Sequence, residues 1–378
     1  MKRLIRCLAA MTAACMLCPA CPAEAPGGDP MLTLLEGLFD GAHNCAFSPV
    51  SLALVLSMAA EGASGETKAQ LDALTGIPDA QTAAALQADL RGRGLRLAGA
   101  VFADDDLALR DAWREAAETA WDAEIFPLGA AEAIDAWVRE KTGGLLDRAP
   151  AVPDKNTRLA LLNAAAMDMK WALPFHEWNT EEDVFHTPAG DVTAAFMLRS
   201  FRGQAYGERG GAQLLRLDYA EENGGMHMLL ILPPEGGTAD VLRGLAGEGL
   251  GYFARMAETD REIILRLPRT DITVRNDLTD PLREAGVTLA FTDAADFSGI
   301  AETPLCISAV AQDVRLQIDE EGTRAAAVTE VLLAAEAALP LEEPILMVLD
   351  RPFIALIVDE ETAAVCFAAV VTDPTGGK

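Results

Sequence analysis

The chain has 378 residues, of which 51% are hydrophobic and 23% are charged. This composition supports a large folded core and excludes a wholly disordered chain. The formal net charge of -28 and the sequence pI of about 4.4 disfavour nucleic acid and anionic membrane surfaces as partners, because phosphate binding needs clustered Lys and Arg.

The first 25 residues have the pattern of a secretory signal peptide. A basic start is followed by an apolar run over residues 8–17, which is too short for a permanent transmembrane helix. We expect residues 1–25 to be removed and residues 26–378 to be secreted as one domain. A lipoprotein leader, which would anchor the chain at the cell surface, is the alternative, although the flanks of Cys15 and Cys21 match such a leader poorly.

Hydrophobic patterning predicts helices mainly in the first half of the chain and strands mainly in the second. Ser48 followed by Pro49 indicates a helix start, because serine caps free amides and proline fits the first turn. The order of elements favours one α+β domain over alternating βαβ units. The predicted helices are 31–39, 48–60, 66–74, 79–90, 111–121 and 130–141, and the predicted strands are 95–102, 159–169, 226–232, 263–267, 313–318, 354–358 and 365–371.

No pattern of catalytic or metal-binding residues is evident. The four histidines lack metal-ligand spacing, and Ser64 lies in a Gly-Ala-Ser-Gly turn rather than in a Gly-x-Ser-x-Gly motif. Cys45, Cys306 and Cys366 lie far apart in apolar contexts and are expected to be buried free thiols. We predict no metal, no cofactor and no enzymatic activity. A secreted hydrolase using Ser64 or a carboxylate pair is the enzymatic alternative.

The most informative stretch is residues 320–329, which follow a strand-like run. Read with the period of a strand, this stretch has one face of uniformly small residues. Such a segment can enter a crowded sheet as an additional strand. It begins with Glu320, Glu321 and Gly322; the small face carries Thr323, Ala325, Ala327 and Thr329, and the other face carries Arg324, Ala326 and Val328.

From about residue 30 to 374 the chain resembles the serpin family of serine protease inhibitors. The resemblance implies the α+β serpin fold, with helices plus three β-sheets, a large central sheet and an exposed reactive-centre loop at about residues 320–345. It rests on motifs in a fixed order, namely NCAFSPVS at 44–51, Asn163-Ala164-Ala165 followed by Trp171, Leu267-Pro268-Arg269, LREAGV at 282–287, ADFSGI at 295–300 and Asp350-Arg351-Pro352-Phe353.

The resemblance also implies a mechanism of suicide inhibition. A target serine protease, or a cysteine protease, cuts the loop and forms an acyl-enzyme, and the cut loop inserts into the central sheet and traps it. Counting seventeen residues from Glu320 places the cut between Glu336 and Ala337. Glu336 indicates a Glu-specific protease, while the neighbouring alanines indicate an elastase-like or other small-residue protease. We expect a monomer; a non-inhibitory serpin that acts as a binding or chaperone-like module is the alternative.

Further roles follow from the resemblance. Ser48, Ser51, Asn163 and Gln312 match positions that hydrogen-bond beneath the opening sheet (the shutter), and Trp171 matches the point where insertion begins (the breach). Several residues depart from the family pattern. Gly99 stands where asparagine is common, Met169 replaces a usual glycine, and Ala368-Ala369 replaces a usual glycine-containing pair. Arg324 stands where an acidic residue is frequent, and Val328 is larger than the preferred small residue. These last two lie on the face opposite Thr323, where bulk is expected to be tolerated.

Overall fold

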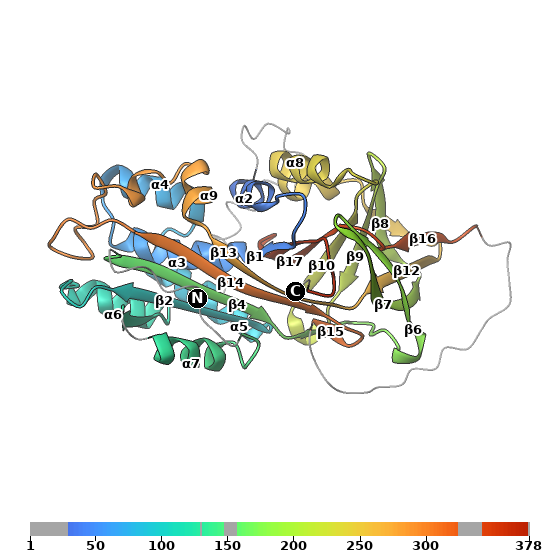
Figure 1. Cartoon of the computed structure of the whole chain (residues 1–378), viewed down its shortest axis with the longest axis horizontal. Coiled ribbons are helices and arrows are strands. Elements are labelled where there is room, and N and C mark those ends of the chain that lie inside the picture. Colours follow the sequence, from blue (N-terminus) through green and yellow to red (C-terminus); the bar gives the residue numbers. More distant parts are fainter. Residues whose placement is uncertain (1–28, 129–130, 147–156, 324–341, 377–378) are drawn as a thin grey trace.

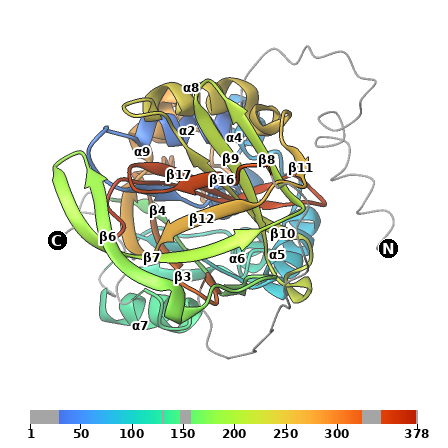
Figure 2. The ribbon, with the colours of Figure 1, turned by 90° about the vertical axis from the view of Figure 1, so that its right-hand side faces the viewer.

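The computed structural model describes residues 29–128, 131–146, 157–323 and 342–376, and Figure 1 shows their arrangement. Most helices lie toward one end of the long axis, and two of the larger sheets lie toward the other end. Figure 2 views the molecule from this second end. Within the described residues, no helix is both long and apolar enough to cross a membrane.

Capping residues start several of the helices. Ser48 accepts a hydrogen bond from the Ser51 amide, and Asp29 accepts hydrogen bonds from the amides of Met31 and Leu32, so otherwise unpaired amides are satisfied. The helices are α2 (Pro30–Leu38), α3 (Pro49–Glu61), α4 (Gly65–Thr75), α5 (Ala80–Gly92), α6 (Asp111–Ala120), α7 (Ala131–Lys141), α8 (Thr238–Glu248) and α9 (Thr279–Glu284). The six predicted helices are confirmed, and α8 and α9 were not predicted.

A sheet of five strands runs along the middle of the molecule (Figure 1). Its two central strands, β14 and β4, pair in parallel, with Gln312 opposite Asn163 and Asp313 opposite Ala164. We call this paired length the seam. The strand order is β13 (Thr270–Asp277), β14 (Ala309–Ile318), β4 (Leu159–Met167), β2 (Leu95–Ala103) and β3 (Glu124–Pro127).

Two other large sheets and one short pair of strands complete the β structure. One of them has seven strands. The five-stranded sheet, which is expected to receive the loop, is therefore not the sheet with the most strands. The seven-stranded sheet runs β1 (Cys45–Phe47), β18 (Val365–Val371), β17 (Phe353–Asp359), β10 (Met226–Leu232), β9 (Ala212–Asp218), β8 (Gln204–Arg209) and β11 (Ala257–Thr259). The four-stranded sheet, at the front in Figure 2, runs β16 (Ile345–Val348), β12 (Ile263–Pro268), β7 (Gly190–Phe201) and β6 (Thr180–Thr187); β15 (Gly322–Thr323) pairs with β5 (Met169–Lys170).

The two faces of the five-stranded sheet pack against different helices. The inner face lies on α3, whose residues are buried from Pro49 to Ala60. On the outer face, Phe102 of β2 and Ile134 and Trp137 of α7 form a smaller apolar cluster. Alternate residues of β4 and β14 therefore point to different layers, which decides which side chains meet at the seam.

Candidate functional site

Gln312 closes the seam from its inner face. Its Oε1 accepts a hydrogen bond from the Ser48 amide at 2.8 Å, and its Nε2 donates to Asn163 Oδ1 at 2.7 Å and to the Ser48 carbonyl at 3.1 Å. The three residues are buried. Strand register explains the meeting of Gln312 and Asn163, because the two residues are directly opposite and share the inner face.

Helix α3 supplies the rest of this network through its first turn. Ser48 Oγ donates to the Cys366 carbonyl at 2.7 Å, and Asn163 Nδ2 donates to the Ser51 carbonyl at 3.0 Å. The hydroxyl of Ser51 has no hydrogen-bond partner among the described residues. It lines a small cavity beside Gln87 and Gly99. The structure thus brings the four predicted shutter residues together, although Ser51 acts through its backbone.

By the resemblance, residues 320–329 form the hinge of the reactive-centre loop, and the structure describes this hinge as far as Thr323. Gly322 and Thr323 pair in antiparallel fashion with Lys170 and Met169. A Cβ on Gly322 would collide with the Met169 carbonyl oxygen, so this close approach requires glycine. Thr323 is buried, and its Oγ1 lies 2.7 Å from the hydroxyl of Tyr219. Thr323 therefore occupies the inner face.

Trp171 holds the start of the hinge and the residue before it. Its amide donates to the Glu321 carbonyl at 2.8 Å, and its Nε1 donates to the Asp319 carbonyl at 3.0 Å. The indole ring stacks on Tyr219 with 4.7 Å between ring centroids. Tyr219 was not singled out by the sequence, because its partners lie about 50 and 100 residues away along the chain.

Glu320 anchors the base of the predicted loop. Its buried carboxylate accepts hydrogen bonds from Arg269 Nε at 2.9 Å and from the hydroxyl of Thr180. Burial alone would raise the pKa of Glu320, but these hydrogen bonds outweigh it and hold the pKa below its usual value. The Phe175 amide also donates to the Glu320 carbonyl at 2.7 Å. Glu320 is thus an ionised side chain that holds the start of the hinge.

The outer face of the seam carries a carboxylate with much poorer contacts. Asp313 is fully buried, and Arg275 Nε lies 3.3 Å from its Oδ2. Neither carboxylate oxygen accepts a hydrogen bond from the described residues. Burial raises the pKa of Asp313 to about 6. The strand pattern predicted Asp313 as part of a strand but gave no sign that its side chain would be buried.

Several predicted residues lie outside the described part of the chain. These are the signal peptide 1–25, the hinge residues 324–329, and Glu336 and Ala337. Ser64 lies between α3 and α4, as the sequence indicated, and the amide of Ser64 donates to the Asp296 carbonyl. In the described ranges, no three His, Cys, Asp or Glu side chains are grouped so that they could hold a metal ion.

Comparisons with known proteins define the class of this fold. The family model described as "Serpin (serine protease inhibitor)" matches residues 32–374. Alpha-1-antiproteinase S of Cavia porcellus is 32% identical over 357 residues, and the match covers 88% of this chain and 85% of that protein. The class is therefore that of the serine protease inhibitors.

Solved structures agree with this class. The native structure of tengpin, a thermophilic serpin, has a TM-score of 0.80 and 26% identity, and the match covers 91% of this chain and 92% of that one. Human thyroxine-binding globulin has a TM-score of 0.82 at 24% identity, covering 98% and 99%, and so shows likeness of fold alone. The chain belongs to the serpin family, whose members generally act on serine proteases.

Proposed function

We propose that the protein is a suicide-type inhibitor of a serine protease. The protease cuts the loop near Glu336–Ala337, becomes covalently attached as an acyl-enzyme, and is trapped when the cut loop enters the seam as a new central strand. Serpin loop insertion combines strand addition with a transition between disorder and order. The protein's own residues supply the bait and the receiving sheet, and the protease supplies the nucleophile.

The pairing of Gly322 and Thr323 with β5 carries the proposal. Thr323 lies opposite Met169, and β5 continues the direction of β4. If the cut loop extends this register, Ala325 and Ala327 would lie on the inner face with Thr323, because side chains alternate along a strand. Arg324 and Val328 would then face outward. Small residues suit the inner face, which is filled by α3 and the shutter residues.

Insertion of the cut loop is expected to make the cleaved protein much more stable than the uncut one. Backbone hydrogen bonds contribute about 1 kcal/mol each, so a strand paired on both edges gains on the order of 15 kcal/mol. This gain is comparable with the stability of an ordinary domain. The uncut protein is therefore expected to persist because of a kinetic barrier rather than because it is the most stable state.

The expected location and target belong to the same proposal. We propose that residues 1–25 direct export and that the mature domain meets its protease outside the cell, as a monomer. Glu336 favours a Glu-specific protease, whereas the flanking alanines favour an elastase-like enzyme. Amino-terminal sequencing of the secreted protein would test the cleavage site, and lipid labelling would separate a free protein from a lipoprotein.

A gel assay tests the inhibitory mechanism. The protein is mixed with pancreatic elastase, a Glu-specific protease and subtilisin, run on denaturing gels, and the released peptide is weighed by mass spectrometry. We expect a covalent complex and a peptide that begins at Ala337. Clean cleavage without a complex and without a rise in thermal stability would contradict the proposal and favour a non-inhibitory binding or chaperone-like serpin.

A further inference from the structure

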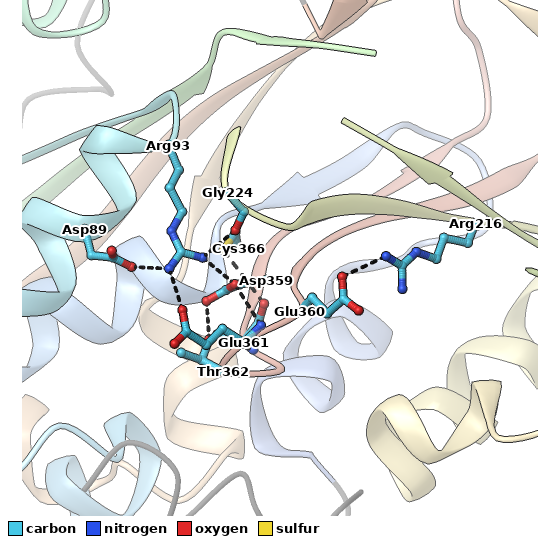
Figure 3. Close-up of polar contacts among 10 residues, drawn as sticks. Asp89, Arg93, Arg216, Gly224, Asp359, Glu360, Glu361, Thr362 and Cys366 are labelled. Carbon is cyan, nitrogen blue, oxygen red and sulfur yellow. Dashed lines mark hydrogen bonds and ion pairs between the residues drawn. The ribbon is translucent and has the colours of Figure 1, made fainter. Parts of the chain in front are cut away.

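A cluster of charges is centred on Arg93, with Arg93 mostly buried, Asp359 buried, and Asp89 and Glu361 about half exposed (Figure 3). Arg93 follows α5 and precedes β2, and its side chain is 12% exposed. Its Nη1 lies 2.6 Å from Asp359 Oδ1, and its Nη2 lies 2.8 Å from Asp89 and 3.2 Å from Glu361. The cluster joins α5 to the hairpin between β17 and β18. We call these contacts the brace.

The ion pair between Arg93 and Asp359 is the buried part of the brace, and the Asp359 carboxylate has further hydrogen-bond donors. Its side chain is 1% exposed, and its carboxylate also accepts hydrogen bonds from the Glu361 amide at 3.1 Å and from Thr362 Oγ1 at 2.6 Å (Figure 3). Removing only one partner of such a pair leaves an uncompensated buried charge, which is strongly unfavourable. The brace therefore holds the hairpin and the start of β2 in one fixed relation.

Arg93 is linked to the insertion end of the seam through the next residue. Gly94 has φ +99, its carbonyl accepts the Asp168 amide at 3.1 Å, and a Cβ on it would lie 2.6 Å from the Asp168 carbonyl oxygen. Asp168 joins β4 to β5, the strand that pairs with Gly322 and Thr323. Two residues, Gly94 and Asp168, thus link Arg93 to β5, the strand that pairs with Gly322 and Thr323.

A second link runs through the turn between β9 and β10. Arg93 Nη1 donates to the Gly224 carbonyl at 3.1 Å, and Asn223 Nδ2 donates to the Arg93 carbonyl at 3.0 Å. In the same turn, the Ala220 amide donates to the Lys170 carbonyl at 2.8 Å. Both ends of β5 therefore contact segments that also contact or adjoin Arg93.

We propose that Arg93 is a positioning residue for loop insertion, tying the β2–β4 side of the seam to the seven-stranded sheet at the end where the loop enters. The inference rests on the proposed function, since an entering strand must part β4 from β14. The β14 side is tied separately to the seven-stranded sheet, because Asn276 Nδ2 of β13 donates to the Ala46 carbonyl of β1 at 2.7 Å. Loosening the brace removes one of the ties on the β4 side of the seam, while the tie through Asn276 on the β14 side is unchanged.

The same hairpin turn offers a matched control. Arg216 Nη2 lies 2.8 Å from Glu360 Oε2, and Figure 3 shows this pair on the other side of the turn from Arg93. Glu360 is 57% exposed, and within the described residues its hydrogen bonds and ion pairs do not reach Gly94 or β2. Removing this exposed pair should matter little.

The test measures seam opening on the uncut, full-length protein. A fluorescent synthetic peptide with the sequence of residues 323–336 is incubated with each variant, and its incorporation is followed on native gels. Arg93→Met and the double variant Arg93→Met/Asp359→Asn, which leaves no unpaired carboxylate at position 359, are compared with Glu360→Gln. We expect incorporation to be about tenfold faster in the brace variants and changed by less than about twofold in the control.

The outcomes separate the two proposals. If the double variant unfolds more easily but incorporates the peptide at the wild-type rate, Arg93 is only a stabilising residue and the inference is overturned. An equal acceleration by Glu360→Gln would also overturn it. If the wild-type protein neither takes up the peptide nor gains heat resistance after cleavage, the proposed inhibitory function fails instead. Should Arg93→Met not fold, the double variant decides.

Discussion

Two neighbouring residues of β14 show how differently the two faces of the seam are built. Gln312 points inward, and its amide makes three buried hydrogen bonds that span β14, β4 and α3. Asp313 points outward, is equally buried, and among the described residues has only the 3.3 Å ion pair with Arg275. Hydrogen bonds of Gln312 on the inner face hold β14 and β4 together, whereas on the outer face the burial of the Asp313 carboxylate is unfavourable. The uncut sheet is thus held by specific contacts and is not optimised for stability.

The largest effect is expected from substitutions in the loop itself, which test the assignment of its two faces. Ala325→Arg places a long cation on the predicted inner face, where there is no room for it, so the cut loop should fail to insert and the inhibitor should become a substrate. Arg324→Glu changes the outer face and should leave inhibition nearly intact. The stoichiometry of inhibition measures both; equal damage from the two changes would refute the face assignment.

The inner network can be broken without touching the loop. Gln312→Ala leaves the Ser48 amide and Asn163 Oδ1 without their partner, so we expect the free energy of unfolding to fall by about 3 kcal/mol. We also expect the seam to open more readily and the protein to lose inhibitory activity on mild heating. Gln317→Ala, on the outer face of the same strand, is the control and should cost less than about 0.5 kcal/mol in urea titrations. Similar losses in both variants would remove the special role of Gln312.

The contribution of Asp313 to stability is expected to depend on pH with the opposite sign from that of most carboxylates. Because burial raises the folded-state pKa of Asp313 to about 6, the stability that protonation provides is present at low pH and is lost as pH rises from about 4 through 6. Asp313→Asn stays neutral, so it should stabilise the protein by about 2 kcal/mol at pH 8 and by about half of that at pH 5.

Thermal unfolding at the two pH values measures this effect. Asp271 offers a matched control on the same face, because it accepts two hydrogen bonds from Arg315. Asp271→Asn should slightly destabilise the protein at pH 8. A loss of stability in Asp313→Asn at pH 8 would mean that the ion pair with Arg275 outweighs the cost of burying the carboxylate.

The smallest effect concerns packing beneath β2. A Cβ on Gly99 would meet only Val55, at 3.8 Å, and Gly99 borders the cavity that Ser51 and Gln87 also line. Gly99→Ala should therefore stabilise the uncut protein by about 0.5–1 kcal/mol, because alanine loses less conformational entropy on folding. Differential scanning calorimetry would show a small rise in Tm. A fall in Tm would show that the inner face has no spare room at this position.

The fold could be predicted where local patterns are strong. The cap at Ser48 and the apolar runs of β4, β10 and β18 gave elements close to those observed. Strand β6 was missed because only Phe185 of its eight residues is buried, which leaves no alternation to detect. Helix α8 was also missed, although the spacing of Val241, Leu242 and Leu245 was a usable signal.

The candidate site was predictable only in part. Ser48, Asn163 and Gln312 were named from the family pattern, and their meeting follows from strand register. Arg93 and Asp359 could not be paired from the sequence, since they are 266 positions apart and no periodicity links them. Ion pairs between distant segments depend on how whole layers pack, so they emerge only with the tertiary structure.

The pairing of Thr323 with Met169 has a kinetic consequence. A strand that must first find its register spends most of its time searching, whereas one that already holds its first pair only has to lengthen. A slip by one residue would turn Arg324 inward, so this pair also guards against misalignment. In the proposed mechanism, trapping requires that strand growth is faster than hydrolysis of the acyl bond. The slow search for the correct register would then already be complete before the protease cuts the loop.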